Sequence, residues 1–481
     1  MTANRGQFGS RLGFIFAAAG SAVGLGNIWG FPTQAASNGG AAFLLVYLIL
    51  AFALAYPVLM AELILGRYTH GNSVAALSGI SRGPVTKAIG TSTGLLGILV
   101  ASMILSFYGI VAGWMLGYTI AYPLEVVGAS AAANWLTGFT IPRNLILMGV
   151  FMLMTIAIIM GGVKEGIERW SSRLMPTLII TLIALAAYVL TLEGAMTGLR
   201  VYLIPDFSKI LSSQLILSAL GSAFFSLSLG VGTMLVYGSY ISDKEHLPSI
   251  GAQVALIDVG IAVLAGFLIL PVMYVAAERG VEIFSASGAL LSEDTLILTV
   301  LPELFATMGT VGIALATAFF FLMTIAALTS SISILEVPVA FIVERFDWSR
   351  KRAAIVAGGL IAGLSSLIIL DFENLFGAVI ALSTRYGQPL LGLLLCLFVG
   401  WVWQRNAVLA ELQKNDPQVA EGVFWRIWPV YVRFVCPIIK DSGPRGIFCH
   451  AIKDFGSGSI FSYAIKDSGA GGIFLPRQQG L

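Results

Sequence analysis

The chain has 481 residues, of which 57% are hydrophobic and 11% are charged, and its mean hydropathy is +0.90. This balance excludes an ordinary soluble domain, in which about a quarter of the residues are charged. The formal net charge of +2 gives no sign of a nucleic-acid partner. The composition predicts an integral membrane protein whose surroundings are the lipid bilayer.

Apolar stretches of about 20 to 30 residues alternate with short charged connections, and each stretch can cross a hydrocarbon core about 30 Å thick as a helix. The chain is therefore predicted to be an all-α polytopic protein. We do not expect a cleavable signal peptide, because the first 14 residues lead straight into a span. Ten full spans are placed near residues 11–37, 41–68, 88–123, 144–162, 167–192, 213–241, 248–276, 305–342, 352–370 and 374–403.

Positive residues favour the cytoplasmic ends of spans. With the N-terminus in the cytoplasm, the inner loops and ends collect about 16 Lys or Arg residues, against about four on the outer side. The predicted location is the inner (plasma) membrane of the cell, with a cytoplasmic N-terminus.

The region after Trp403 differs from the spans. Residues 425–439 begin like an eleventh span but contain Arg426 and Arg433 and then stop. A repeat with a period of 13 residues follows, and each copy carries Lys-Asp and at least two glycines. We expect one membrane domain over residues 1–435, with a partial eleventh helix, and a poorly ordered repetitive tail over 436–481.

Two of the spans contain residues that are unfavourable in a helix exposed to lipid. The first contains Gly24, Gly26 and Asn27 within AGSAVGLGNIWGFP, and the sixth contains FFSLSLGVG at residues 224–232. Such residues are tolerated at membrane depth where freed backbone lines a cavity or is buried in protein. One such stretch alone would more often mark close helix packing through small residues. Two at matching places in two five-helix halves point to an inverted-repeat transporter with its site at the midplane.

Several longer segments carry a specific resemblance. They are RLGFIFAAAGSAVGLGNIWGFP, GGAAF followed by AELILGRY, KEGIERWSSRLMP, FFSLSLGVGTMLVYGSY and LTSSISILE, in that order along residues 5 to about 435. Together they resemble the neurotransmitter:sodium symporter family, in its bacterial sodium-dependent amino-acid transporter branch. The resemblance implies a LeuT-like fold, a 5+5 inverted repeat with broken helices 1 and 6.

The resemblance also implies two sodium ions and no organic cofactor. Sodium is a hard cation that prefers oxygen ligands, by the logic that holds for other hard ions. The first sodium site would use Ala22, Asn27, Ser226 and Asp258 together with the carboxylate of the substrate. The second would use Gly20, Val23, Ala326, Thr329 and Ser330.

Asp258 is the only charged residue between His246 and Glu278. An intramembrane carboxylate is costly unless it meets a cation or a partner. Relatives with a neutral residue here bind chloride nearby, so a fixed carboxylate predicts chloride-independent transport. A shift of the alignment by four residues would put Asp258 at the chloride position, with the same consequence. A protonated acid satisfied by its neighbours is the other interpretation.

The resemblance implies a substrate pocket whose polar end holds a carboxylate and whose other end is apolar. Gly24 stands where monoamine carriers have an aspartate, so the substrate is expected to be an amino acid with its own carboxylate. Val231 stands where a relative has Phe and leaves room, which favours a hydrophobic or aromatic side chain. The pocket residues are Ala22, Gly24, Gly26, Ile104, Tyr108, Phe225, Ser226, Ser228, Val231, Ser330 and Ile334.

The gates match the family in part. The inner gate would use Arg5, Ser239, Tyr240 and Glu344. Gly166 and Pro176 match a glycine-proline pair that would let the fifth helix unwind, and a static kink at the proline is the alternative interpretation. At the outer gate, Gly30, Ala223 and Ile380 replace an expected arginine, glutamine and aspartate. Arg385 in the tenth span could replace that gate or extend its charged end to the interface. Glu62 and Glu336 are expected to be partners for freed backbone N–H groups.

The predicted function is sodium-coupled symport that imports an amino acid by alternating access, and not enzymatic catalysis. A channel would more often show a repeated filter or rings of charge. An enzyme would need a nucleophile with a base or a metal cluster, and the histidines and cysteines form no such group. The remaining alternatives are a transport-inactive or regulatory member of the same fold, because of its unusual C-terminus, or a symporter of another small carboxylate-bearing solute.

Overall fold

The computed structural model describes residues 6–210, 212–283, 296–403, 405–414 and 422–435. The described residues form helices and no strands. Eight of their helical stretches are long and apolar enough to cross a membrane, and a bent pair in the first span makes nine. The predicted tail over residues 436–481 and the inner-gate residue Arg5 lie outside the described residues.

The first half of the chain contains five spans. They are α1 (Arg11–Ala22) with η1 (Gly26–Gly30) and α2 (Phe31–Ser37); α3 (Ala41–Leu50) continued by η2 (Ala51–Ala55) and α4 (Tyr56–Thr69); α6 (Pro84–Val126); α8 (Ile141–Met160); and η3 (Val163–Glu168) with α9 (Arg169–Val189). Shorter connecting helices are α5 (Ser73–Gly79), α7 (Ser130–Thr137), α10 (Ala195–Leu203) and η4 (Phe207–Lys209).

The second half repeats this order. Its spans are α11 (Ser213–Ser226) with α12 (Thr233–Gly238); α13 (Leu247–Glu278); α16 (Gly309–Phe346); α17 (Arg350–Leu370); and α18 (Phe372–Ile380) continued by η6 (Ala381–Gly387), α19 (Gln388–Leu397) and η7 (Phe398–Val402). Before α16 lie η5 (Leu296–Val300) and α15 (Leu301–Ala306), and after the tenth span lie α20 (Arg405–Gln413), α21 (Val423–Val430) and η9 (Tyr431–Val435).

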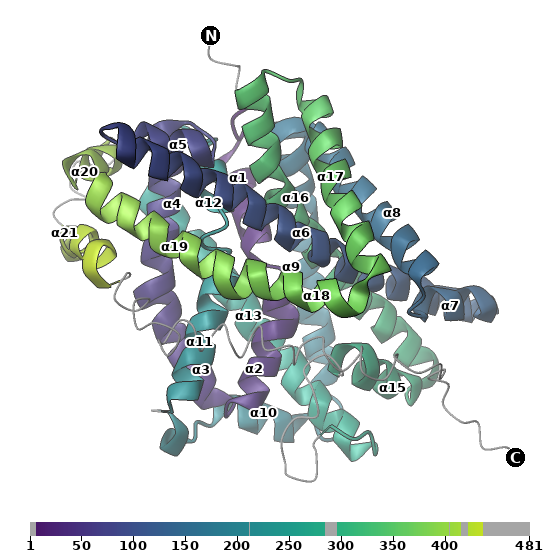
Figure 1. Cartoon of the computed structure of the whole chain (residues 1–481). Coiled ribbons are helices and arrows are strands. Elements are labelled where there is room, and N and C mark those ends of the chain that lie inside the picture. The colour runs from purple at the N-terminus through teal and green to yellow at the C-terminus, as the bar shows by residue number, and fades with distance from the viewer. Residues whose placement is uncertain (1–5, 211, 284–295, 404, 415–421, 436–481) are drawn as a thin grey trace, which may run out of the picture.

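Equivalent helices of the two halves pack against each other. The third span α6 lies along the eighth, α16, and the fourth span α8 lies along the ninth, α17 (Figure 1). The second span contacts the seventh through α4 and α13. This pairing is the one that a two-fold relation between five-helix halves produces, and the predicted 5+5 inverted repeat is confirmed.

Helices occupy the ten predicted ranges in the predicted order, with differences at their ends. The third span is longer than expected, because α6 extends from Pro84 to Val126. The sixth is not one helix, because α11 ends at Ser226 and α12 begins at Thr233. The partial eleventh helix packs on the second span, where the Trp428 indole N–H donates to the Pro57 carbonyl at 3.1 Å.

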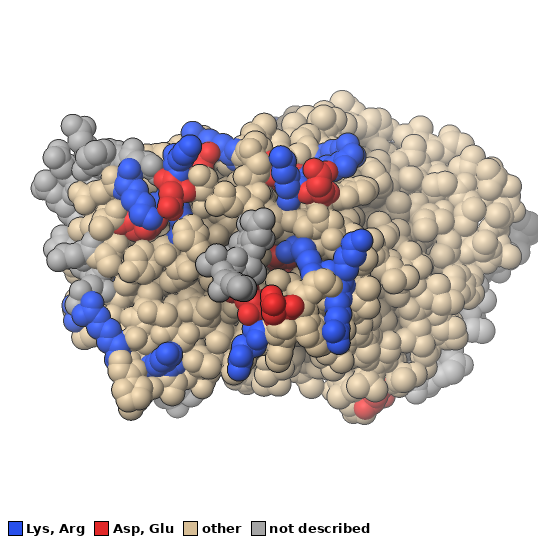
Figure 2. Space-filling view, turned by 90° about the horizontal axis from the view of Figure 1, so that it is seen from above, with Lys and Arg blue, Asp and Glu red and all other residues tan. Residues whose placement is uncertain are grey.

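Charged side chains gather on one end of the helix bundle. Figure 2 views the end that is uppermost in Figure 1, and Lys and Arg lie there together with Asp and Glu. The starts of three spans contribute exposed positive residues, namely Lys87, Lys164, Lys351 and Arg352. Along the spans, the exposed side chains include many Leu, Ile and Phe residues, as a lipid-facing surface requires.

Candidate functional site

The first span is interrupted at Val23 and Gly24, and its two halves meet at an angle of 58°. The Asn27 side chain bridges the break, because its Oδ1 accepts from the Gly24 N–H at 3.2 Å. A Cβ at Gly24 would lie 2.6 Å from Ser330 Oγ, and one at Gly26 would lie 2.6 Å from Phe225 Cε1. Glycine is therefore required by close contacts across the break.

The sixth span is interrupted over residues 227–232. Ser228, Gly230 and Gly232 have positive φ angles of 51°, 80° and 84°, which a helix does not allow. The Gly230 N–H donates to Glu62 Oε1 at 2.7 Å, and the Leu229 carbonyl accepts from Gln388 Nε2 at 3.0 Å. Side chains of the second and tenth spans thus satisfy backbone groups that the break exposes, which confirms the expected role of Glu62.

The two breaks lie against each other and against the seventh span. Ser228 Oγ donates to the Ser21 carbonyl at 3.0 Å. Asn27 Nδ2 lies 2.7 Å from Ser226 Oγ and 2.7 Å from Asp258 Oδ1, and Ser226 Oγ donates to Asp258 Oδ2 at 2.7 Å. Three of the four predicted ligands of the first sodium site, Asn27, Ser226 and Asp258, are therefore in direct contact.

The charge of Asp258 makes this cluster attractive to a cation. The residue is fully buried, and within the described part of the chain no Lys, Arg or His forms an ion pair with it. A buried carboxylate without a positive partner is costly. A dehydrated Na⁺ among the carboxylate, amide and hydroxyl oxygens would compensate for that cost.

A second group of oxygens lies where α1 ends against α16. Ser330 Oγ is within hydrogen-bond distance of the Gly20, Ser21 and Val23 carbonyls, at 3.4, 3.3 and 3.1 Å. Thr329 Cβ would be 3.1 Å from a Cβ at Gly20. The last carbonyls of a helix lack intrahelical partners and carry negative partial charge. Gly20, Val23, Thr329 and Ser330 of the predicted second sodium site are thus neighbours.

The predicted substrate pocket collects around Gly24. Tyr108 Oη accepts from the Leu25 N–H at 3.2 Å and lies 2.8 Å from the position of a Cβ at Gly24. Ile104, Val231 and Ile334 are buried, so the apolar residues expected at the side-chain end of the pocket do not face lipid. The predicted pocket residues thus bring the hydroxyls of Tyr108 and Ser330 together at this end, with no acidic side chain at position 24.

The described inner-gate residues form two separate contacts. Tyr240 Oη donates to Glu336 Oε1 at 2.6 Å, and Arg350 Nη1 donates to the same oxygen at 3.0 Å. Glu344 Oε2 accepts from Asn72 Nδ2 at 2.7 Å. The prediction that Glu336 binds a freed backbone N–H is wrong, because its partners are an arginine and a tyrosine from other segments.

The remaining gate residues are placed as follows. Gly166 lies in the π-helical turn η3, where a Cβ would meet the Ile158 carbonyl at 2.1 Å, and Pro176 lies inside α9. Ala223 is fully buried and Ile380 is half-buried. The half-buried Arg385 lies in η6, with its guanidinium carbon 5.8 Å from the centre of the Tyr386 ring. These positions leave both interpretations of Arg385 open.

Two polar residues near these sites were not singled out from the sequence. Gln388 holds the sixth-span break, and Glu168 binds the N-terminal end of the first span through Gly9 and Ser10. Glu168 stands inside the motif KEGIERWSSRLMP, so a signal for it existed. Gln388 follows a glycine and precedes a proline in the tenth span, a local irregularity that could have drawn notice.

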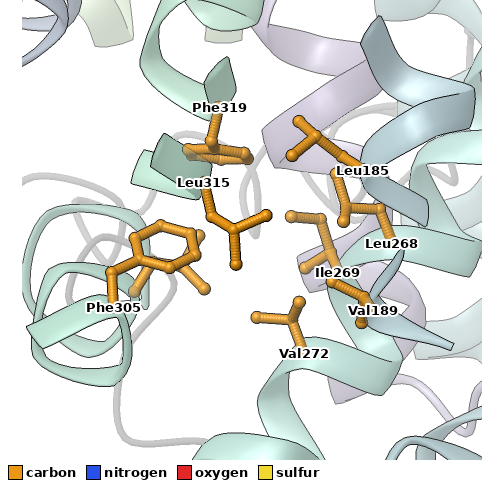
Figure 3. A pocket seen from close by; sticks show the side chains of 9 residues that line it. Leu185, Val189, Leu268, Ile269, Val272, Phe305, Leu315 and Phe319 are labelled. Carbon is orange, nitrogen blue, oxygen red and sulfur yellow. The ribbon is translucent and has the colours of Figure 1, made fainter. Parts of the chain in front are cut away.

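A small cavity lies away from these clusters. It has a volume of about 10 Å³ and is lined by apolar side chains of α9, α13, α15 and α16, among them Leu185, Val272 and Phe305 (Figure 3). A space of this size holds at most one water, and its apolar walls favour an empty void. None of the residues that line it belongs to the polar sites described above.

Comparison with known proteins agrees with this arrangement. The family model described as the sodium:neurotransmitter symporter family matches residues 5–138 and 136–442. The uncharacterized sodium-dependent transporter YhdH of Bacillus subtilis is 34% identical over 450 residues, covering 90% of this chain and 95% of that protein. The sodium- and chloride-dependent taurine transporter of Bos taurus is 27% identical over 325 residues, covering 58% of this chain and 52% of that protein.

A solved structure resembles the whole chain. The crystal structure of MhsT in complex with L-phenylalanine is 37% identical in sequence and has a TM-score of 0.76. The match covers 95% of this chain and 100% of that one.

Proposed function

The chain belongs to the sodium:neurotransmitter symporter family and is a multi-pass, sodium-dependent transporter of that family, and on this premise we propose that it imports a hydrophobic or aromatic amino acid together with two sodium ions. Transport would occur by alternating access in the inner membrane, with the N-terminus in the cytoplasm. The charged end in Figure 2 supports this orientation, since positive residues favour the cytoplasmic side.

The observation that carries the proposal is the contact of Asn27, Ser226 and Asp258 at the two helix breaks. In our proposal the first sodium ion binds these side chains, the Ala22 carbonyl and the carboxylate of the substrate. The second binds Gly20, Val23, Ala326, Thr329 and Ser330. Because the substrate carboxylate completes the first site, sodium and amino acid would bind cooperatively, and this explains coupling between them.

The pocket supports an amino acid with an apolar side chain. Gly24 leaves the region beside Tyr108 and Ser330 without an acid that could pair with a bare amine. Ile104, Val231 and Ile334 would contact the side chain of the substrate. MhsT, which has a similar structure, was solved with L-phenylalanine, and this favours the same class of substrate here.

We also propose that transport is independent of chloride, because Asp258 supplies a fixed negative charge beside Ser226 and Tyr47. The Tyr47 hydroxyl lies 3.5 Å from Ser226 Oγ, so Asp258 and Tyr47 flank the same serine. The taurine transporter that is partly similar is named as chloride-dependent. In our proposal Asp258→Ser removes the fixed charge and either abolishes transport or makes it depend on chloride.

The test is uptake of a mixture of labelled amino acids into proteoliposomes, with sodium or chloride replaced in turn. We expect uptake of hydrophobic or aromatic amino acids that stops without sodium and continues without chloride. Uptake that is indifferent to sodium would contradict the coupling. If a folded protein takes up no amino acid, the result would favour a regulatory member of the fold or a symporter of another carboxylate-bearing solute. If the Asp258→Ser variant transports at the parent rate without chloride, the proposed role of Asp258 is contradicted.

A further inference from the structure

The polar residues in the outer half of the sixth span lie in one row along the helix. In α11, Gln214, Ser218, Ser222 and Ser226 follow one another at intervals of four residues, and we refer to these four residues as the polar row. Apart from Ser213 at its first position, the other residues of α11 are apolar or glycine. Side chains four residues apart are neighbours on the surface of an α-helix. The polar row therefore continues from the exposed Gln214 to Ser226, which is 3% exposed.

The inner end of the polar row is the cluster proposed as the first sodium site. Ser226 Oγ donates to Asp258 Oδ2 at 2.7 Å and lies 2.7 Å from Asn27 Nδ2. The helix α11 begins at the end of the bundle that lies away from the charged end, in the lower part of Figure 1. In the proposed orientation, the polar row thus leads from the outer side of the membrane to the carboxylate of Asp258.

The two central serines of the polar row have no hydrogen-bond partner. Ser218 is 2% exposed and Ser222 is 4% exposed, and the Oγ atom of each meets no donor or acceptor within the described residues. Several buried hydroxyls in other spans bond to the carbonyl one turn earlier, as Ser365 does to Ile361 at 3.0 Å. A buried hydroxyl without a partner is costly. These two hydroxyls are therefore suited to a polar ligand that contacts them in another state of the transport cycle.

The charges around the polar row favour a cation as that ligand. The helix α11 contains no charged residue, and the charge at the inner end of the row is the carboxylate of Asp258. Hydroxyl oxygens can replace part of the water around a hard cation such as sodium. Successive members of the row are about 6 Å apart along the helix axis, so an ion that leaves one hydroxyl reaches the next over a short distance. An anion on the same route would be repelled by Asp258.

We propose that the polar row is an entry path for sodium, along which the ion passes from the outer surface to the first sodium site. The inference rests on the proposed function, and it gives Ser218 and Ser222 a role in the approach of the ion and not in its final coordination. In the outward-facing form, water reaches the row and the hydroxyls solvate the ion in turn. After closure the hydroxyls are buried as in this structure, and the apolar residues around them hinder the return of the ion.

Single cysteines along α11 test whether ions reach the polar row. The variants are Ser218→Cys and Ser222→Cys, made after the three native cysteines are replaced by alanine. The matched variants are Ala219→Cys and Ala223→Cys, because both alanines are 0% exposed and lie at the same depth in the same helix but outside the row. The purified proteins are kept in detergent micelles with potassium and without sodium. Each is treated with a small cationic methanethiosulfonate and with an anionic one of similar size, and each rate is divided by the rate for a free thiol.

We expect both serine variants to react with the cationic reagent at least about tenfold faster than the two alanine variants do, and faster than with the anionic reagent. Replacement of potassium by sodium at constant ionic strength is expected to slow the reaction of Ser222→Cys, because sodium then occupies the site one turn further along the row. Equal reaction of the serine and alanine variants, or a faster reaction with the anionic reagent, would overturn the entry path.

A second measurement separates a path from a ligand, and it decides the question if a cysteine variant does not fold. The double variant Ser218→Ala/Ser222→Ala removes both hydroxyls, and Ser331→Ala is its control, since Ser331 Oγ is also buried without a partner but belongs to α16. Both are expected to bind radioactive sodium at equilibrium like the parent. When mixed with sodium, the double variant is expected to change its tryptophan fluorescence about tenfold more slowly than the parent and the control.

An unchanged rate of the fluorescence response, or a weaker equilibrium affinity of the double variant for sodium, would contradict the path. If the parent itself binds no sodium, the sodium coupling of the proposed function fails. The labelling contrast between the serine and alanine variants then still decides whether the polar row admits small cations.

Discussion

Glycine at position 24 lets two hydroxyl groups approach the backbone at the centre of the candidate site. A methyl group there would lie 2.6 Å from Ser330 Oγ and 2.8 Å from Tyr108 Oη. Neither hydroxyl can withdraw freely, because Ser330 faces the carbonyls of α1 and Tyr108 accepts from Leu25 N. A substitution at position 24 therefore tests whether the substrate binds beside these two hydroxyl groups.

We predict that Gly24→Ala reduces amino-acid uptake at least about tenfold, since overpacking costs about 1 to 3 kcal/mol. The control is Gly149→Ala in α8, where a Cβ would meet nothing within 4 Å. Alanine is the better helix former by about 1 kcal/mol, so this control should transport normally and melt no lower than the parent. Uptake by both variants at the parent rate would show that the space around Gly24 does not bind the substrate.

Asp258 offers a second test at a single residue. Asp258→Asn keeps the size of the side chain and one oxygen acceptor but removes the charge. We predict that the sodium concentration for half-maximal uptake rises about tenfold or more, because intramembrane charges gain most from a bound counter-ion. Asp371→Asn is the control, since Asp371 is exposed at the start of α18. An unchanged sodium dependence of Asp258→Asn would remove this residue from the site.

Single residues were predictable where the reason was local or shared with a family. Glu62 was expected to bind freed backbone, and it does so at Gly230. Glu336 was given the same role, but Arg350 and Tyr240 reach it from other segments. Which side chain a buried acid meets depends on how distant segments pack, and no local pattern around Glu336 contains that information.

Among the elements, the break in the sixth span has its own supports. Gln388 donates to the Leu229 carbonyl, and a Cβ at Gly230 would lie 2.7 Å from the Gln388 carbonyl oxygen. The tenth span thus touches the break with both side chain and backbone. The two breaks were predictable because glycine and polar residues are unusual in lipid-facing helices. Their partners and the π-helical turns were not, because these arise from tertiary contacts.

We predict that Gln388→Met lowers the melting temperature of the purified protein and raises the KM for the amino acid. The substitution leaves a buried carbonyl without its donor, at a cost of about 1 to 3 kcal/mol. Gln253→Met is the control, because the Gln253 side chain is exposed and its contact with Arg11 is at the surface. If both variants melt together with the parent, the hydrogen bond to Leu229 does not stabilise the break.

At the scale of the whole molecule, the two five-helix halves are completed by contacts that the inverted repeat does not contain. The resemblance to a known family made the repeat itself predictable. It did not predict α20, which follows the tenth span and returns to the end of the second. There Arg67 Nε donates to Glu411 Oε1 at 2.7 Å, between residues 344 positions apart in the chain. Each side chain of this pair is only 1% exposed.

The pair allows a prediction about the stability of the whole fold. Arg67 also donates to the carbonyls of Glu245 and Glu411, so it joins the second span, the segment after the sixth span, and α20. Removing one member of a buried ion pair typically costs about 3 to 5 kcal/mol. Lys414 Nζ lies 2.8 Å from Glu411 Oε2 and still compensates part of the Glu411 charge, so we expect a loss at the lower end of this range. Arg67→Met should therefore lower the melting temperature strongly, whereas Glu165→Gln, which breaks the exposed pair with Arg169, should change it little.

The double variant Arg67→Met/Glu411→Leu separates the two sources of that loss. It removes both charges, so it should melt higher than Arg67→Met alone even though it has lost one more native side chain. Thermal unfolding of the three proteins in the same detergent gives the comparison. If the double variant melts lower than Arg67→Met, the cost lies in lost packing and backbone contacts around α20, and the buried charge of Glu411 is not what Arg67 compensates.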